Sequence, residues 1–252
     1  MKPYLSIIIP AYNEAKRLPQ TLVDIDHRLQ GVDFSYEIIV VDDGSKDATV
    51  QVAKKFSGMI KNLRVIENQE NKGKGGVVKQ GMLEAKGNIR LFDDADNSTS
   101  IDHFFKMIDY FKEGYGVVIG SRDIKGAKFD PPQPFYKRLF GEVGNLIIQT
   151  LLLPGIRDTQ CGFKAFTEEA AEKIFPLTKI TRWSLDVEVL SLAKQLGYRI
   201  KEIPVLWKND ADSRVKGSTY IQFFTEVLKI RMWLWQDAYK IKDFLKIKNL
   251  KK

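Results

Sequence analysis

The sequence contains a single cysteine, Cys161, among its 252 residues. One cysteine cannot form an internal disulfide, so a disulfide-stabilised secreted scaffold is excluded and a cytoplasmic location is expected. With 9 prolines and 18 glycines the chain also lacks the composition of collagen-like or low-complexity proteins. Its 44% hydrophobic and 29% charged residues are typical of a globular protein that can bury a substantial core.

Long apolar runs are absent as well. The run from Leu5 to Ile9 stops at Pro10 and is too short for the core of a signal peptide, and the run 146–153 is interrupted by Gln149 and Thr150. A membrane-spanning helix needs about 20 consecutive apolar residues. We therefore expect no transmembrane segment.

The basic charge of the chain is concentrated at one end. The net charge is +8, and nine basic but only three acidic residues fall between Lys216 and Lys252. The rest of the chain is close to balanced, which argues against nucleic acid as a partner of the whole protein. We expect one folded domain over residues 1–215, followed by a basic, amphipathic helical tail over residues 216–252.

Short apolar runs alternate with helical patterns over the first 120 residues. The expected strands are Leu5–Ile9, Glu37–Val41, Leu63–Ile66, Ile89–Phe92 and Val117–Ile119, and the expected helices between them are Leu18–Leu29, Ala48–Phe56, Val77–Ala85 and Phe104–Phe111. This alternation predicts an α/β fold with a mostly parallel central sheet. Further along, we expect helices over 135–153, 185–196 and from Asp212 to the end, and a strand over 199–207.

Acidic residues follow three of the expected strands, at the edge where an open α/β sheet binds its ligand. They lie in Pro10–Glu14, in Asp42–Ser45 and in Asp93–Asp96. Each cluster alone could be a turn or a helix cap. Three acidic clusters at one edge repel one another unless a cation or a polar ligand compensates them. The sequence therefore indicates a divalent metal ion at this edge.

The strongest single motif is Asp94-Ala95-Asp96. Two carboxylates at the end of a buried strand can bind Mg²⁺ or Mn²⁺ and leave positions open for the phosphates of a nucleotide diphosphate. The stretch Asn71–Gly76 lacks the first glycine and the closing Lys-Ser/Thr pair of a P-loop. Its backbone N–H groups and Lys74 could still lie near an anion at a helix start.

Together these motifs resemble the family 2 glycosyltransferases of GT-A fold. The resemblance extends from about residue 5 to about residue 215 and is greatest to the polyprenyl-phosphate branch, which includes dolichyl-phosphate β-glucosyltransferases and dolichol-phosphate mannose synthases. The matching segments are Ile9–Glu14, Val40–Ser45, Asn71–Gly76, Asp94–Asp96, Gly120–Arg122, Asp158–Lys164, Arg182–Glu188 and Asp212–Arg214.

The resemblance implies an enzyme that transfers a hexose, with inversion, from a nucleotide sugar to a dolichyl or undecaprenyl phosphate, and UDP-glucose is the expected donor. The implied donor-binding residues are Pro10, Tyr12, Glu14, Asp42, Lys74, Asp94 and Arg214, with Asp94 and Asp96 as ligands of Mg²⁺ or Mn²⁺. The implied acceptor-phosphate residues are Arg122 and Arg138. Asp158 matches the aspartate regarded as the base in this family, and we expect it to orient the acceptor first and to accept a proton second. Asp158, Asp96 and Arg122 are thus the expected catalytic residues.

A lipid acceptor would place the enzyme at a membrane. Apolar residues recur at steps of three and four over 220–250, with lysines between them. We expect this segment to attach the enzyme reversibly to the anionic cytoplasmic face of a membrane. The alternative is that the stripe packs on the domain, on a partner subunit or on a second copy of the chain.

Other functions stay open at this point. Within the family, the donor could be GDP-mannose or the acceptor a glycan. A nucleotidyltransferase could also use Asp94 and Asp96, although Pro10–Glu14 stands where such an enzyme needs a basic glycine-rich loop. A non-catalytic membrane-binding or RNA-binding module would explain the basic tail alone. His27 and His103 fall in helical patterns and are expected at the surface, and Cys161 is expected to be buried.

Overall fold

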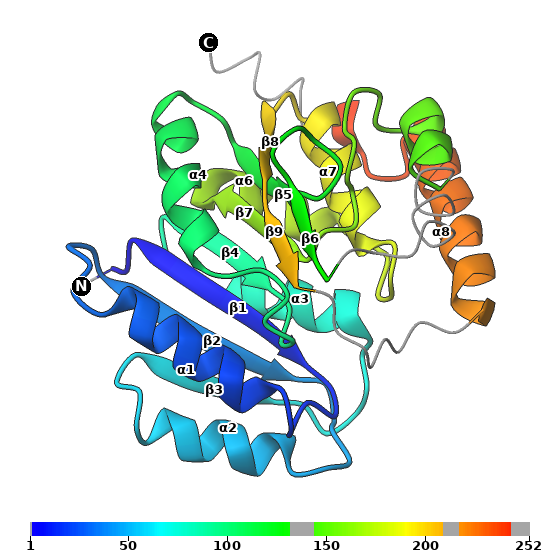
Figure 1. Ribbon diagram of the computed structural model, residues 1–252. Coiled ribbons are helices and arrows are strands. Elements are labelled where there is room, and N and C mark those ends of the chain that lie inside the picture. Colours follow the sequence, from blue (N-terminus) through cyan, green and yellow to red (C-terminus); the bar gives the residue numbers. More distant parts are fainter. Residues whose placement is uncertain (1, 132–143, 209–216, 243–252) are drawn as a thin grey trace.

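The computed structural model describes residues 2–131, 144–208 and 217–242 (Figure 1). Its centre is a seven-stranded sheet in the order β3-β2-β1-β4-β7-β5-β8. The strands are β1 (Leu5–Ala11), β2 (Tyr36–Asp42), β3 (Leu63–Glu67), β4 (Ile89–Asp93), β5 (Val117–Ser121), β7 (Phe163–Thr167) and β8 (Ile200–Pro204). All neighbours are parallel except β7, which is antiparallel to both β4 and β5. The predicted α/β fold with a mostly parallel sheet is confirmed.

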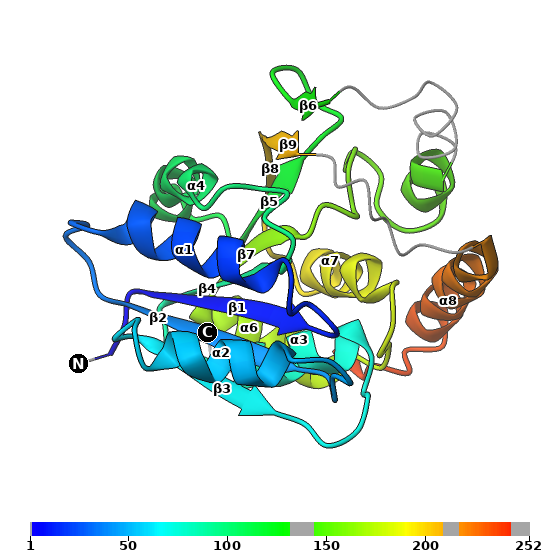
Figure 2. The same ribbon diagram turned by 60° about the horizontal axis from the view of Figure 1, so that its bottom comes forward.

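Helices cover both faces of the sheet. One core contains residues of α1 (Leu18–Leu29), α2 (Thr49–Ser57) and α4 (Asp102–Lys112), and the other contains residues of α3 (Lys74–Glu84), α6 (Glu168–Ile174), the 3₁₀ helix η1 (Phe175–Leu177) and α7 (Leu185–Gln195). Successive side chains of a strand point to opposite faces, so Ile7 and Ile9 of β1 join the first core and Ile8 the second. Figure 2 shows α1 and α4 on one side of the sheet and α3 and α6 on the other.

The strands and helices expected over the first 120 residues are present, with ends that differ by a few residues. Strand β7 and helix α6 were not expected. The apolar run of β7 is interrupted by Lys164, whose side chain is nevertheless fully buried. A strand that contains a charged residue does not show the continuous apolar pattern of a buried strand.

The strand expected over 199–207 is two strands in two different sheets. After β8 the chain continues as β9 (Leu206–Lys208), which pairs in parallel with β6 (Lys128–Asp130) to form a separate two-stranded sheet. Within β9, Trp207 also forms an antiparallel bridge with Thr99, in the loop that follows β4. The small sheet therefore joins the loops at the carboxyl ends of β4, β5 and β8.

The helix expected from Asp212 to the end is interrupted. Helix α8 (Gly217–Trp235) is followed by a turn in which Asp237 and Lys240 have φ values of 52° and 55°. Val227 and Ile230 of α8 and Tyr239 of the turn are buried in the core that contains α7. The described part of the tail is therefore packed on the domain along one side.

Two further expectations concern helices. Of the helix expected over 135–153, residues 144–151 are helical, and 135–143 lie outside the described residues. None of the helices in the described ranges has the length and apolarity needed to cross a membrane.

Candidate active site at the carboxyl edge of the sheet

The loops that follow β1 and β2 are tied to each other. Ala11 pairs with Asp42 at the ends of the two strands, and the backbone N–H of Asn13 donates to Ser45 Oγ at 2.9 Å. Asp42 is 1% exposed, and its Oδ2 accepts the backbone N–H of Ser45 at 3.0 Å. Its Oδ1 is buried and has no hydrogen-bond partner within the described part of the chain. A buried acceptor that lacks a donor costs about 1–3 kcal/mol, so this oxygen is suited to accept a hydrogen bond from a ligand.

The other residues expected to bind the sugar-nucleotide donor at this edge differ in the groups that they leave accessible to it. Pro10 is buried in β1, and Tyr12, just beyond the strand, is 39% exposed. The Glu14 carboxylate is already paired, because Arg17 donates to it through Nε at 2.7 Å and Nη2 at 2.6 Å. Tyr12 and Asp42 are therefore the residues of this set that present an aromatic ring and an acceptor to a ligand.

In the stretch Asn71–Gly76, called the lysine-glycine loop from here on, the backbone N–H groups of Gly75 and Gly76 are bonded within the protein and do not face an anion. Gly75 and Gly76 donate their backbone N–H groups to the Thr181 carbonyl oxygen at 2.9 and 3.3 Å. A Cβ atom at Gly73 would lie 2.3 Å from the same oxygen. The expectation of an anion-binding loop is therefore wrong for these groups, and the glycines instead allow the loop to pack closely against residue 181.

Lys74, from the same loop, reaches the carboxylate pair. Its Nζ lies 2.7 Å from Asp94 Oδ1, and the Asp96 Oδ1 accepts the backbone N–H of Ser98 at 3.0 Å. Burial, and next the charge of Asp94, raise the pKa of Asp96 above its ordinary value. Burial and both neighbouring aspartates raise the pKa of Asp93 as well. Negative charge at this point of the edge is thus only partly compensated by Lys74.

The donor set fits a hard divalent cation. Asp94 and Asp96 provide carboxylate oxygens, the ligands that Mg²⁺ and Mn²⁺ prefer, and a cation would offset the charge that raises the pKa of Asp96. Among the described residues no group of three or more His, Cys, Asp or Glu side chains could hold a metal ion. A cation bound here would therefore need further ligands from substrate phosphates or water.

Residues around β7 contact the Asp94–Asp96 segment. The backbone N–H of Asp94 donates to the Gly162 carbonyl oxygen at 3.2 Å, and a Cβ atom at residue 162 would lie 1.9 Å from Asp94 Oδ2.

Deeper in the core, Lys164 Nζ lies 2.5 Å from Asp186 Oδ1. Burial alone would lower the pKa of Lys74, but Asp94 and Asp186 outweigh it and raise that pKa. The sequence motifs contain Lys164 and Asp186, but nothing in their spacing assigned them a role.

Arg122 and Asp158 form a clamp where β5 ends and the chain approaches β7. Arg122 donates to Asp158 Oδ2 through its backbone N–H (2.9 Å) and Nε (2.7 Å), and to Oδ1 through Nη2 (2.9 Å). The backbone N–H groups of Gln160 and Cys161 also donate to Oδ1. Burial opposes ionisation of Asp158, but Arg122 outweighs it and holds the pKa of this carboxyl below its ordinary value.

This geometry changes how Asp158 can act. The carboxylate has no exposed surface, and among the described residues it accepts only from Arg122 and from the backbone N–H groups of residues 160 and 161, while the Asp158 backbone N–H donates to Glu202 Oε1 at 3.0 Å. Its expected catalytic role stays a prediction, but in this structure any effect on the acceptor has to pass through Arg122. Arg138 and Arg214, the other two arginines expected at phosphates, lie outside the described residues.

Arg122 faces an open cavity. Its side chain is 20% exposed and lines a cavity of about 600 Å³. The rest of the lining consists of four polar residues, Asp123, Asn145, Gln149 and Arg157, and four apolar ones, Ile124, Ala127, Phe129 and Leu146. A cavity with a guanidinium at one end and apolar side chains beside it suits an amphiphilic anion.

His103 is a correction to the sequence analysis. It was expected at the surface but is 8% exposed, with Nδ1 3.1 Å from the Ser100 carbonyl oxygen and Nε2 accepting the backbone N–H of Leu206 at 3.0 Å. The expectation is wrong because the helical pattern could not show that β9 packs over the start of α4. His27 is exposed and Cys161 is fully buried, as expected.

An open α/β sheet with a carboxylate pair, a buried unpartnered acceptor and a clamped arginine at one edge has the architecture of a sugar-nucleotide transferase. The comparisons with known proteins agree with this class. The model of the family described as "Glycosyl transferase family 2" matches residues 6–175. The chain belongs to glycosyl transferase family 2 and is a glycosyltransferase.

Relatives with curated names resemble nearly the whole chain. A dolichyl-phosphate beta-glucosyltransferase of Dictyostelium discoideum is 38% identical over 253 residues, which cover 95% of this chain and 77% of the relative. The Homo sapiens protein of the same name is 33% identical, over 98% of this chain and 76% of the relative.

Solved structures of lower identity share the fold. Glucosyl-3-phosphoglycerate synthase from Mycobacterium tuberculosis, in complex with Mn²⁺, UDP and phosphoglyceric acid, has a TM-score of 0.68 at 19% identity, over 90% of this chain and 77% of that one. Mannosyltransferase PcManGT from Pyrobaculum calidifontis, in complex with GDP-Man and Mn²⁺, has a TM-score of 0.62 at 20% identity, over 91% and 65%. At this identity the likeness confirms the GT-A-type fold alone.

Proposed function

We propose that this enzyme transfers glucose from UDP-glucose to a dolichyl or undecaprenyl phosphate. The observation that carries the proposal is the meeting, at one sheet edge, of the carboxylates Asp94 and Asp96 with Arg122 at the mouth of a cavity. The first suits a nucleotide diphosphate, and the second suits a phosphate on a lipid. The sugar and the acceptor rest on the names of relatives 33–38% identical to this chain.

On the donor side, Tyr12 and Asp42 bind the nucleoside. The unpartnered Asp42 Oδ1 accepts an N–H from the base, which relieves the cost of its burial. Asp94 and Asp96 hold Mg²⁺ or Mn²⁺ against the diphosphate, and Lys74 adds a fixed positive charge beside Asp94. Such a cation, when bound, neutralises charge on the departing UDP.

On the acceptor side, the nucleophile needs no strong base. The second pKa of a phosphate monoester is about 6, so its oxygen is largely ionised at neutral pH. That oxygen forms a bond to the anomeric carbon of glucose while the bond from this carbon to UDP breaks, and the electron pair leaves with UDP. Arg122 orients the acceptor phosphate through the N–H donors that Asp158 does not use.

A panel of nucleotide sugars tests the proposed function. Each is supplied with a polyprenyl phosphate and Mg²⁺ or Mn²⁺, and both UDP release and the glycolipid product are measured. We expect UDP-glucose to be the best donor, with a product of inverted anomeric configuration. Transfer from GDP-mannose would contradict the donor assignment, transfer to a glycan would contradict the acceptor, and release of pyrophosphate would indicate a nucleotidyltransferase.

Asp96→Asn tests the metal assignment. We expect the variant to fold normally, to lose transfer by about 10³-fold and to lose the Mn²⁺-dependence of UDP binding in calorimetry, because it removes one of the two proposed carboxylate ligands of the metal. Metal-dependent UDP binding that survives in this variant would contradict the assignment.

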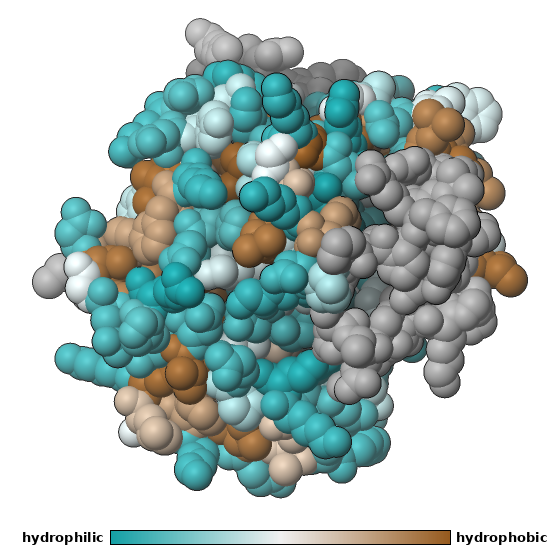
Figure 3. All heavy atoms as spheres, in the orientation of Figure 1, coloured by the Kyte–Doolittle hydropathy of each residue, from teal (hydrophilic) through white to brown (hydrophobic). Residues whose placement is uncertain are grey.

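We propose further that α8 attaches the enzyme to a membrane by its outer side. Ile221, Leu228 and Trp235 are spaced seven residues apart and are 72%, 58% and 80% exposed, with Lys229 and Arg231 between them. Leu146, 63% exposed, lies on the helical segment 144–151 beside α8. Hydrophobic surface is visible along this edge of the molecule (Figure 3). An exposed apolar row with basic neighbours suits the anionic cytoplasmic face of a membrane.

Co-sedimentation with anionic liposomes tests this attachment in the full chain. We expect Leu228→Glu to weaken binding by about 10-fold, and Met59→Glu to leave it unchanged, because Met59 is 69% exposed but follows α2, away from α8. Equal binding by both variants would contradict the assignment to α8. A doubled mass in light scattering that Leu228→Glu abolishes would instead assign this row to a second copy of the chain.

A further inference from the structure

The guanidinium group of Arg122 lies over the indole ring of Trp207. The Cζ of Arg122 lies 4.7 Å from the centroid of the indole. We propose that Trp207 is a positioning residue, which fixes the direction in which Arg122 presents its remaining N–H donors to the acceptor phosphate. This inference rests on the proposed function for the identity of the acceptor, but the contact itself is independent of it.

The edge and the face of the guanidinium are restrained by different groups. Asp158 accepts from Nε at 2.7 Å and from Nη2 at 2.9 Å, which fixes the guanidinium in its own plane. A carboxylate pair of this kind still permits rocking out of that plane. The Arg122 Cζ lies over the Trp207 ring, and a ring in this position opposes the rocking, because the cation is attracted to the ring and excluded by its bulk.

Strand β9, which carries Trp207, is held in place by contacts of its backbone. Leu206 donates its backbone N–H to His103 Nε2 at 3.0 Å, Lys208 donates its backbone N–H to the Ser98 carbonyl oxygen at 2.8 Å, and Trp207 bridges Thr99 between them. These contacts hold three successive residues of β9 on one stretch of chain. The indole therefore cannot shift along the strand direction without breaking them.

The stretch that holds β9 begins two residues after Asp96. The Ser98 N–H donates to Asp96 Oδ1, and the Ser98 carbonyl oxygen accepts from Lys208. One short segment thus connects Asp96, an expected metal ligand, with the strand whose indole lies over Arg122. The position of the acceptor-binding guanidinium is set relative to the donor side through this segment and Trp207.

A double-mutant cycle tests whether Trp207 acts through Arg122. The variants are Trp207→Leu, Arg122→Gln and the pair together, with Trp207→Phe as the conservative replacement. We expect Trp207→Leu to lower kcat/KM for the lipid phosphate about 10-fold, Trp207→Phe to restore it to within about threefold, and UDP affinity to stay within about twofold of the parent. In the Arg122→Gln background, Trp207→Leu should add less than about twofold.

The matched control is Tyr115→Leu. It removes an aromatic ring that stacks on Arg199 at 4.0 Å, at the amino end of β5. We expect its kcat/KM to stay within about twofold of the parent. Equal fold losses from Trp207→Leu in both backgrounds, or a loss of UDP affinity in Trp207→Leu, would overturn the proposal, because the residue would then act on the fold or on the donor.

A second measurement does not depend on the reaction. The Nε–H resonance of Arg122 in a ¹⁵N spectrum should shift in Trp207→Leu, through loss of the ring current, and should not shift in Tyr115→Leu. If the enzyme transfers no glucose to polyprenyl phosphate while this resonance shifts as expected, the proposed function fails and the positioning of Arg122 stands. If the resonance does not respond to Trp207→Leu, the positioning proposal fails.

Discussion

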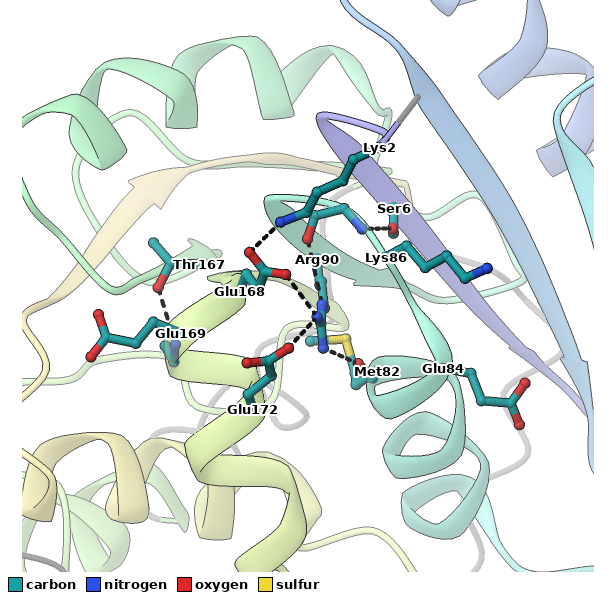
Figure 4. Close-up of polar contacts among 12 residues, drawn as sticks. Lys2, Ser6, Met82, Glu84, Lys86, Arg90, Thr167, Glu168, Glu169 and Glu172 are labelled. Atoms are coloured by element: carbon teal, nitrogen blue, oxygen red, sulfur yellow. Dashed lines mark hydrogen bonds and ion pairs between the residues drawn. The ribbon is translucent and has the colours of Figure 1, made fainter.

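Two arginines at opposite edges of the central sheet are each held by carboxylates, and the difference between them separates a structural site from a functional one. Arg90, at the amino end of β4, is 3% exposed and donates to Glu172 at 3.0 Å and to the carbonyl oxygens of Met82 and Gly87. Figure 4 shows it enclosed by these groups and by Glu168.

Arg122, at the other edge, is 20% exposed and has one carboxylate partner, Asp158, which occupies one side of its fork. Its side chain lines a cavity of about 600 Å³. Arg90 connects α6, β4 and the end of α3, whereas Arg122 is held so that it can bind something else. Burial and ion pairing alone therefore do not distinguish the two roles. The distinguishing feature is the set of guanidinium N–H donors that have no hydrogen-bond partner among the described residues.

The largest effect should come from Arg122→Lys. A lysine keeps the charge beside Asp158 but loses the planar fork, so we expect kcat/KM for the lipid phosphate to fall about 10²–10³-fold. The free energy of unfolding should fall by only about 1 kcal/mol. Steady-state kinetics and urea denaturation measure the two quantities. A variant with full activity would remove Arg122 from the acceptor site.

Asp158→Asn should lower both the transfer activity and the free energy of unfolding. An amide cannot accept all of the N–H donors that surround this carboxylate, so we expect turnover to fall about 10²-fold and the free energy of unfolding by about 2–4 kcal/mol. UDP affinity, measured by calorimetry, should not change. A normal turnover with lowered stability would place Asp158 in the same structural class as Glu172.

In the parent protein the contribution of Asp158 to stability should depend on pH. Because its pKa is lowered in the folded state, the contribution is fully present above the ordinary value of 3.8 and is lost as the pH falls through the folded-state pKa. Unfolding measured between pH 3 and 7 should therefore show no loss from this group near neutrality.

Arg90→Lys sharpens the comparison, because it is the same substitution at the other edge. The lysine cannot serve two carboxylates and two backbone carbonyl groups at once, so we expect the free energy of unfolding to fall by about 2–3 kcal/mol. Transfer activity should stay within about twofold of the parent at a temperature where both are folded. An activity loss comparable to that of Arg122→Lys would break the comparison.

The smallest effect should come from the protonation of His103. Burial lowers the pKa of this imidazole below its ordinary value of 6.5, because it disfavours the charged ring, and it outweighs the hydrogen bond to the Ser100 carbonyl oxygen, which acts in the opposite direction. Its contribution to stability is therefore full above pH 6.5 and falls as the pH drops below that value, by at most about 1.4 kcal/mol for each unit of pKa shift. The charges of Lys106 and Asp102 oppose each other in this shift. The pH-dependence of unfolding in His103→Gln, which cannot titrate, should lack this component.

Much of the sheet could be predicted from the sequence because its strands are buried on both faces. Runs such as Ile7–Ile9 and Ile38–Val41 leave few other folds open, and helical periodicity between them indicated a parallel sheet. The antiparallel β7 could not be predicted in this way. Its second residue, Lys164, is paired with Asp186, a partner 22 residues away whose proximity depends on the complete fold.

The candidate site, like the sheet, could be predicted from the sequence only in part. Motifs after the strands identified Asp42, Asp94 and Asp96, because the carboxyl ends of parallel strands meet at one edge. The contact between Trp207 and Arg122 left no trace in the sequence, since it depends on β9 leaving the main sheet and pairing with β6. Contacts between loops of distant elements have no periodicity to reveal them.

The antiparallel strand β7 also has a consequence for the order in which the enzyme becomes complete. Because β7 runs against its neighbours, its entry loop lies at the edge where β4 and β5 end, and this loop supplies Asp158 to Arg122 and Gly162 to Asp94. The first 122 residues contain Asp94, Asp96 and Arg122 but not the loop that supplies Asp158 and Gly162. A nascent chain that has emerged only that far has its nucleotide-side carboxylates in place but no clamp for the guanidinium, so assembly of the edge waits for residues about 40 positions downstream.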